Sequence, residues 1–399
     1  MYKIGHYQLI TNRLLEKRKF IQVIMGPRQI GKTTVVKQAL QALKNEIPYL
    51  FYSADNIPAT QNTWISDCWE AARSRMKIES SKDFILVIDE IQKLVGWSET
   101  VKKEWDDDSF NDVNLKVVLL SSSRVLLQKG LADSLAGRFE TIKMTHWNFA
   151  EMHEAFGLSF DEYIYYGGYP GAASLIKDPD PDRWSNYIKD SIIEATINKD
   201  ILLDVPISKP ALMRQTFELG ASYSGQMVSL TKIVGSLQDA GNTTTLSGYL
   251  NLLKDSGLLA GLQKFSTDKA RQRASIPKFQ VFNSALRNVY AGYSFREAIQ
   301  EPRVWGHFFE SAVGAHLVSG ALTGNYEVYY WREGDLEIDY ILKRDHKIVA
   351  IEVKSNSDAT NKGLGWFREH YKPHCALVVG KGGLNAEAFL KVNPVKLFE

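Results

Sequence analysis

The chain has 399 residues, of which 44% are hydrophobic and 24% charged, and its formal net charge is +2. This length exceeds a single compact core and indicates about two or three domains of ordinary soluble globular composition. No apolar run approaches the roughly 18 residues that span a bilayer, no signal-peptide core is present, and the two cysteines, Cys68 and Cys375, lie far apart. We therefore expect a cytoplasmic protein without a membrane partner.

A nucleotide-binding motif follows the first apolar run, residues 21–25. Gly26, Gly31, Lys32 and Thr33 form the pattern G-x-x-x-x-G-K-T between this expected strand and an amphipathic segment. Backbone N–H groups of such a loop cradle phosphates, the lysine supplies a positive charge, and the threonine hydroxyl ligates Mg²⁺. ATP and Mg²⁺ are predicted to bind the loop residues Gly26, Pro27, Arg28, Gln29, Ile30, Gly31, Lys32, Thr33 and Thr34.

The segment FILVIDE, residues 84–90, predicts a buried parallel strand that ends in two acids. Asp89 is expected to hold the Mg²⁺ shell and Glu90 to polarise the attacking water, with Lys32 stabilising the phosphates. The alternative is a strand followed by an acidic helix start. After a P-loop, the catalytic interpretation is favoured.

Two weaker catalytic candidates follow. The strand LKVVLLSSS, residues 115–123, ends in serines, and Ser122 could sense the γ-phosphate or orient the water. Arg138 could neutralise charge in the transition state, either within its own subunit or on a neighbouring one in a homo-oligomer. The alternatives are a plain strand-to-loop transition and an ordinary surface arginine.

Several motifs in fixed order extend the pattern: GPRQIGKTT, DEIQK, VVLLSSS, SLAGRFE, WNFAE and GGYPGA. Together they resemble a prokaryotic family of AAA+-like ATPases that carry a C-terminal nuclease-like domain of unknown function. The family usually has Gly-Ser-Ser after the fourth strand. In this chain Ser121 stands where that glycine would be. The resemblance implies an α/β protein whose residues 1–205 form an AAA+-like P-loop ATPase domain with a parallel sheet and a helical lid.

Residues 206–290 predict a winged-helix domain. Apolar residues recur at helical spacing in 229–238 and 245–255, across a short turn, and two alternating segments flank a basic loop. Ten Lys or Arg against four Asp or Glu give this region a local charge of +6. We predict contacts to DNA through Asn242, Thr243 and Thr244 in a groove and through Lys269, Arg271 and Arg273 on phosphates. The alternative is a rigid protein spacer.

Residues 291–399 predict an α/β domain with a hairpin that turns at Asp345 and His346. This register sets Asp339 opposite Glu352, with Lys354 on the same face, and Glu310 could add a third carboxylate from a helix. The set resembles the PD-(D/E)XK nuclease fold. It predicts a second Mg²⁺ or Mn²⁺ held by Glu310, Asp339 and Glu352, with Lys354 stabilising developing charge. The alternative is a domain that persists as an interaction module.

The leading hypothesis is therefore an Mg²⁺-dependent ATPase whose nucleotide state repositions a winged helix and a nuclease-like domain on DNA. The alternative is a nucleotide-gated signalling or defence switch whose last domain binds partners and cuts nothing.

Overall fold

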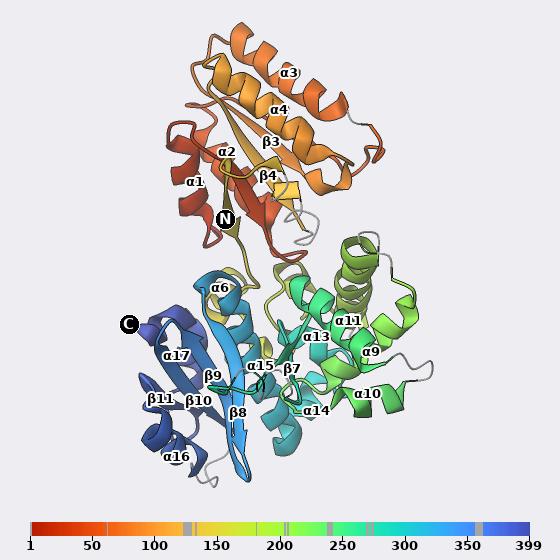
Figure 1. Ribbon diagram of the computed structural model, residues 1–399, viewed down its shortest axis with the longest axis vertical. Coiled ribbons are helices and arrows are strands. Elements are labelled where there is room, and N and C mark those ends of the chain that lie inside the picture. The colour runs from red at the N-terminus through yellow and green to blue at the C-terminus, as the bar shows by residue number, and fades with distance from the viewer. Residues whose placement is uncertain are drawn as a thin grey trace. The chain divides into compact units, whose positions relative to one another are not determined.

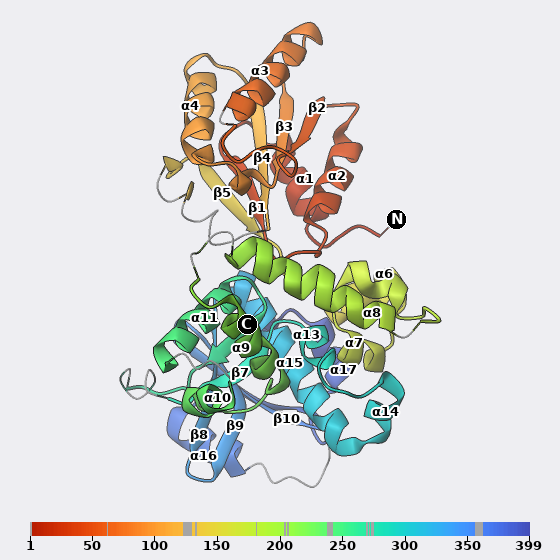
Figure 2. The same ribbon diagram turned by 90° about the vertical axis from the view of Figure 1, so that its right-hand side faces the viewer.

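The computed structural model describes most of the chain in two compact units, Met1–Met144 and Thr145–Glu399 (Figures 1 and 2). The described residues are 2–61, 63–122, 130–131, 134–180, 182–202, 205, 207–237, 242–268, 270, 272, 275–355 and 362–399.

The first unit is built on a five-stranded parallel sheet. Its strands are β1 (Ile21–Met25), β2 (Tyr49–Ser53), β3 (Phe84–Asp89), β4 (Leu115–Ser121) and β5 (Phe139–Lys143), in the order β2-β3-β4-β1-β5. The three central strands are buried along their whole length, which is why they are almost entirely apolar. Because the strands are parallel, the loops after β1, β3 and β4 meet at one edge of the sheet.

Helices cover both faces of this sheet (Figure 2). The helices are α1 (Tyr7–Leu15), α2 (Lys32–Leu43), α3 (Thr63–Ile78) and α4 (Trp97–Phe110), with a short 3-10 turn, η1 (Ile91–Lys93). One face packs against α3 and α4 through Trp69 and Trp105, both of which are buried. The opposite face is covered by α1 and α2.

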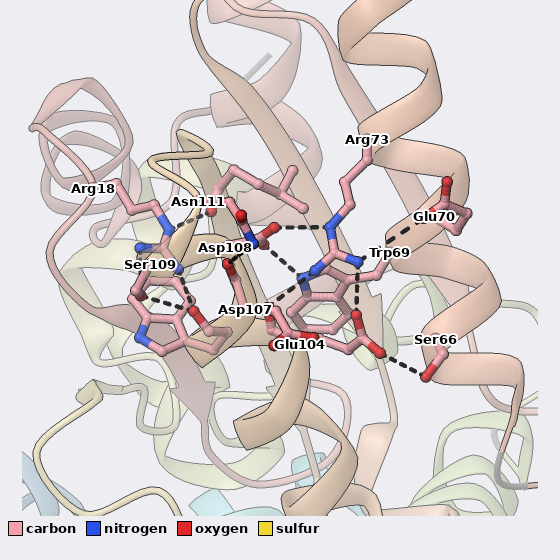
Figure 3. A network of polar contacts seen from close by, with 12 residues as sticks. Arg18, Ser66, Trp69, Glu70, Arg73, Glu104, Asp107, Asp108, Ser109 and Asn111 are labelled. Carbon is pink, nitrogen blue, oxygen red and sulfur yellow. Dashed lines mark hydrogen bonds and ion pairs between the residues drawn. The ribbon is translucent and has the colours of Figure 1, made fainter.

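A buried ion-pair network joins α3 to α4 (Figure 3). Arg73 donates from Nε to Asp108 Oδ1 at 2.8 Å and from Nη1 to Glu104 Oε2 at 2.8 Å. The Trp69 indole N–H donates to Asp108 Oδ2 at 3.0 Å. The Asp108 side chain is only 1% exposed, so these donors replace the water that the carboxylate gives up.

Asp108→Ala is expected to lower the free energy of unfolding by about 3 kcal/mol, because it leaves a guanidinium and an indole N–H short of a buried partner. Glu70→Ala is the matched control, because Glu70 lies 3.9 Å from the same arginine but is 68% exposed; its effect should stay within about 0.5 kcal/mol. Denaturant unfolding of the two variants checks the difference. Equal losses would contradict a structural role for the Asp108 network.

The second unit contains more helix. Its helices and turns are α6 (Phe149–Phe156), α7 (Phe160–Tyr166), η2 (Pro170–Leu175), α8 (Asp182–Asn186), the π-helical segments η3 (Tyr187–Glu194) and η4 (Ile197–Leu202), α9 (Pro210–Ser222), α10 (Leu230–Ser236), α11 (Thr243–Asp255), α13 (Ser284–Asn288), α14 (Phe295–Gln300), α15 (Pro302–Gly324), α16 (Lys362–Tyr371), α17 (Ala386–Lys391) and η5 (Pro394–Phe398). None of the helices in the described part of the chain is long and apolar enough to cross a membrane.

Two sheets complete this unit. The larger contains β8 (Glu327–Glu333), β9 (Leu336–Arg344), β10 (Lys347–Lys354) and β11 (Cys375–Gly380), in the order β11-β10-β9-β8, and the smaller pairs β6 (Leu259–Leu262) with β7 (Lys278–Val281). The antiparallel register of β9 and β10 runs from Arg344 opposite Lys347 to Tyr340 opposite Ile351. The predicted hairpin register is confirmed over these pairs, and Asp339 and Glu352 are the next residues along the two strands.

Helix α15 packs closely on both sheets. A Cβ built on Gly314 would lie 2.1 Å from Gln280 Oε1 in β7 and 2.2 Å from the Tyr340 hydroxyl in β9, so any larger residue would displace these two side chains. The Tyr340 hydroxyl donates to Gln280 Oε1 at 2.9 Å, and Gln280 Nε2 donates to the Ser311 carbonyl at 2.9 Å. Strand β7, the second of the two segments expected to flank the basic loop, is therefore joined to the C-terminal sheet by a buried polar network.

The unit boundary differs from the predicted one. Helices between residues 149 and 202, expected as a lid on the first domain, lie in the second unit. There the Asn288 side chain donates to the carbonyls of Ile164 and Tyr165, at 3.1 and 2.7 Å, and Asn283 Oδ1 accepts from Gly168 N–H at 3.2 Å. These buried hydrogen bonds connect the helical segment to residues more than a hundred positions away. They also give its buried backbone N–H and C=O groups hydrogen-bond partners.

Candidate functional site

The loop after β1 has the close backbone geometry that a phosphate cradle requires. A Cβ on Gly26 would lie 2.4 Å from the Met144 carbonyl oxygen, so this position excludes any side chain. Gly31 has a φ of 90° and precedes α2, whose N-terminal N–H groups face the loop. A helix N-terminus with no side-chain cap is a favourable site for an anion.

Lys32 lies at the start of α2 and is 7% exposed. Its ammonium donates to the carbonyl oxygens of Gly26, at 2.9 Å, and Pro27, at 2.8 Å. These bonds hold the positive charge against the loop. The charge therefore lies in the loop where a phosphate is expected to bind.

Thr33 and Asp89 fit the role of an Mg²⁺ site. The Thr33 hydroxyl donates to Asp89 Oδ2 at 2.8 Å, so a hydroxyl from the P-loop helix and a carboxylate from the end of β3 meet at one point. Burial, and then the neighbouring Glu90, raises the pKa of Asp89. A divalent cation bound to these oxygens would offset the desolvation of the carboxylate.

Glu90 points to the end of β4. Its Oε2 accepts hydrogen bonds from Ser122 Oγ at 3.0 Å and from Gln92 Nε2 at 2.7 Å. Since β4 lies between β1 and β3, the polar residues after β4 lie between the P-loop and the acidic pair. The structure thus brings together Glu90 and Ser122, two residues that were predicted separately as catalytic candidates. The structure also shows that Gln92 contacts Glu90, which was not predicted. The only sign of this contact in the sequence is that Gln92 lies two residues after Glu90.

The structure places Arg138 away from this edge. Arg138 directly precedes β5, and its carbonyl accepts from Ile21 N–H at 2.8 Å, at the start of β1. It therefore lies at the amino ends of the strands, roughly 15 Å along the sheet from the P-loop. Its guanidinium makes two hydrogen bonds to Asp106, at 2.7 and 2.9 Å. This position does not support a catalytic role within its own subunit, because a residue before a parallel strand lies opposite the ligand edge; the role on a neighbouring subunit stays a prediction.

A second cluster of charge lies in the C-terminal unit. Lys278 Nζ lies 2.9 Å from Glu310 Oε1 and 3.3 Å from Asp339 Oδ1. Burial alone would lower the pKa of Lys278, but the two carboxylates raise it well above its usual value. Lys278 is therefore charged at neutral pH, and it contacts two of the three carboxylates that were predicted to hold a metal ion.

Glu352 and Lys354 form a separate ion pair beside this cluster. Asp339 Oδ2 accepts from Val353 N–H at 2.8 Å, so its second oxygen is also engaged. Burial, and then Asp339, raises the pKa of Glu352. Within the described part of the chain, no group of three or more His, Cys, Asp or Glu side chains could hold a metal ion. The metal site predicted at Glu310, Asp339 and Glu352 therefore stays a prediction: Lys278 pairs with Glu310 and Asp339, and Lys354 pairs with one oxygen of Glu352.

The residues predicted to contact DNA are only partly described. Asn242 caps α11, accepting from Thr245 N–H at 2.8 Å, and Thr243 and Thr244 are exposed at the first turn. The predicted basic residues Lys269, Arg271 and Arg273 lie outside the described residues.

Family models cover nearly the whole chain in three segments. A model described as "AAA domain" matches residues 18–153, and two described as domains of unknown function, DUF8612 and DUF4143, match residues 157–297 and 305–398. With the P-loop geometry above, the first match shows an AAA+-like P-loop domain on a parallel α/β sheet.

Two curated relatives are similar over most of their length. An uncharacterized protein of Haemophilus influenzae is 26% identical over 387 residues, covering 91% of this chain and 89% of that protein. Uncharacterized protein MJ1544 of Methanocaldococcus jannaschii is 22% identical, covering 86% and 76%. Among solved structures, the Aeropyrum pernix ORC1 protein in complex with DNA is 12% identical, with a TM-score of 0.32, and covers 73% of this chain and 92% of that one. That score is too low for an inference about this chain.

Proposed function

We propose that this chain is an Mg²⁺-dependent ATPase that binds ATP at residues 26–34 and hydrolyses it at the carboxyl edge of the first sheet. The observation that carries the proposal is the 2.8 Å hydrogen bond between Thr33 and Asp89, which joins the P-loop to the acidic strand end. ATP would supply the phosphates and Mg²⁺ the bridging charge. Lys32 would bind the phosphates, and Thr33 and Asp89 would hold the ion.

Glu90 would orient the attacking water. Its hydrogen bonds to Ser122 and Gln92 hold the carboxylate in one orientation beside the Mg²⁺ ligand Asp89. A fixed carboxylate can accept a proton from water and align it with the γ-phosphate. Ser122 and Gln92 would act as positioning residues, since each contacts the carboxylate.

The second unit would couple this hydrolysis to DNA through α10 and α11. The exposed first turn of α11 and the local charge of +6 in residues 206–290 support a phosphate-contacting helix pair. The alternative is a nucleotide-gated switch in which the same unit binds a protein. It is favoured by strand β7, whose Lys278 and Gln280 contact the C-terminal sheet.

DNA-stimulated ATP hydrolysis by the purified chain tests this coupling. The DNA hypothesis expects turnover to rise when duplex or branched DNA is added at low salt and to return to the basal rate as salt increases. Basal turnover that is unchanged by either DNA at any salt concentration would favour the protein-binding switch and leave the ATPase proposal intact.

Replacing Lys269, Arg271 and Arg273 together with alanine tests the basic loop. If all three contact phosphates, the slope of log affinity against log salt should become shallower by about two to three. Equilibrium DNA titrations at several salt concentrations give this slope. The matched control replaces Lys44, Lys77 and Lys82, three exposed lysines of the first unit, and should leave the slope unchanged. The same slope in both triple variants would mean that the loop does not contact DNA.

A further inference from the structure

Lys278 lies in a setting built for a cation. It is 1% exposed, and its ammonium lies within 3.3 Å of three oxygens: Glu310 Oε1, Asp339 Oδ1 and the Asp339 carbonyl. The Tyr340 ring lies 4.7 Å from the same nitrogen. Oxygen acceptors on one side and an aromatic face on the other satisfy an ammonium that has lost its water.

The same oxygens do not suit a divalent ion while this lysine is present. Mg²⁺ requires oxygens at about 2.0–2.1 Å in octahedral geometry. Here the nearest carboxylate oxygens of Glu310 and Asp339 are spaced around a nitrogen at 2.9 and 3.3 Å. A divalent cation between them would lie about 3 Å from an ammonium, where like charges repel strongly. The site can hold one cation or the other.

The backbone around Lys278 fixes the side chain in place. Phe279, the next residue of β7, exchanges backbone hydrogen bonds with Gly225 and Gln226, at 2.8 and 2.9 Å. Gln280, two residues along and therefore on the same face, bonds to Tyr340 and to the Ser311 carbonyl. Moving the Lys278 ammonium outward would break its own bonds to Glu310 and Asp339 and leave these carboxylates without their cation.

Glu352 gives a second, independent observation that the cluster resembles a metal site. It is 8% exposed, and its Oε2 has no hydrogen-bond partner within the described part of the chain, whereas its Oε1 pairs with Lys354. A buried carboxylate oxygen without a donor is costly in a purely structural ion pair.

We propose that Lys278 is a resident cation that replaces the divalent metal between Glu310 and Asp339, so that the nuclease-like domain binds no metal and cleaves no DNA. The lysine comes from the β6–β7 hairpin, and the acids come from α15 and β9. The Lys278 ammonium therefore occupies the site and also holds the hairpin against the sheet. This inference is independent of the ATPase, whose residues lie in the other unit.

The test is a thermal melt of the full chain, without nucleotide, in the presence and absence of Mn²⁺. Adding Mn²⁺ should change the Tm of wild type and of Asp339→Asn by the same small amount. Lys278→Ala should lower the Tm by about 5–10 °C, because it strips a buried ion pair of its cation. Mn²⁺ should restore much of that loss, because the space opened beside the acids admits an ion.

Two variants serve as controls. Lys278→Met removes the charge but fills the volume, so it should be destabilised without a Mn²⁺ response. Lys278→Ala combined with Asp339→Asn should lose the response seen in Lys278→Ala. A Mn²⁺ shift in wild type that disappears in Asp339→Asn would overturn the proposal, whether or not Lys278→Ala folds. An unchanged Tm in Lys278→Ala, or a loss that Mn²⁺ does not restore, would also overturn it.

Discussion

Glu90→Gln is expected to bind ATP with nearly wild-type affinity and to hydrolyse it about 100- to 1000-fold more slowly. The amide keeps the size of the carboxylate and can still bond to Gln92 and Ser122, but it can no longer accept a proton from water. The phosphate ligands Lys32 and Thr33 are unchanged, so binding should persist. Steady-state phosphate release and an ATP titration measure the two quantities separately.

Gln92→Ala is the matched comparison for this variant. It removes one hydrogen bond, 2.7 Å long, from the Glu90 carboxylate but leaves the carboxylate itself. Turnover should fall by about tenfold or less, in line with the loss of one positioning hydrogen bond. Turnover in Glu90→Gln equal to that of wild type would assign the water-orienting role to another residue.

Lys32→Ala is expected to weaken ATP binding by about 100-fold or more, corresponding to about 3 kcal/mol for lost charge-assisted hydrogen bonds to phosphate. The loop should keep its shape, because Gly26 and Gly31 still set its backbone. Circular dichroism of the variant should therefore match wild type, and its Tm should fall only by the loss of the two hydrogen bonds from Lys32 to the Gly26 and Pro27 carbonyls. An equilibrium titration with a fluorescent ATP analogue measures the loss.

A control for Lys32→Ala is Lys37→Ala, since Lys37 lies further along the same helix α2 and is exposed. It removes the same charge from the same helix without touching the loop. Unchanged ATP affinity in Lys32→Ala, or an equal loss in both variants, would contradict the assignment of Lys32 as the phosphate ligand.

The local patterns of the chain predict the nucleotide site well. The P-loop, the strand of residues 84–89 and the serines after residue 120 each occupy a short segment, and parallel strands bring their ends to one edge. The prediction for Arg138 rests on residue type alone, and a residue that precedes β5 lies at the opposite edge of its own sheet, so only the role on a neighbouring subunit stays a prediction. Topology, and not residue type, decides its position.

The charged cluster of Lys278, Glu310 and Asp339 in the second unit could be predicted only in part. Turn position alone sets the β9–β10 register, so the neighbouring positions of Asp339 and Glu352 follow from the sequence. Lys278 is 32 and 61 residues from Glu310 and Asp339. In the sequence it is one more basic residue at the start of a strand. Only the packing of β7 against α15 reveals that its ammonium is buried between the acids.

The most direct test of the central claim is Mg²⁺-dependent ATP hydrolysis by the purified wild-type chain. We expect steady release of phosphate with ATP and Mg²⁺, loss of that release when Mg²⁺ is chelated, and its recovery when Mg²⁺ is added back, because Thr33 and Asp89 act only through the ion. Phosphate release that continues at the same rate after chelation, or no release at all from protein that binds Mg²⁺ and ATP, would contradict the claim.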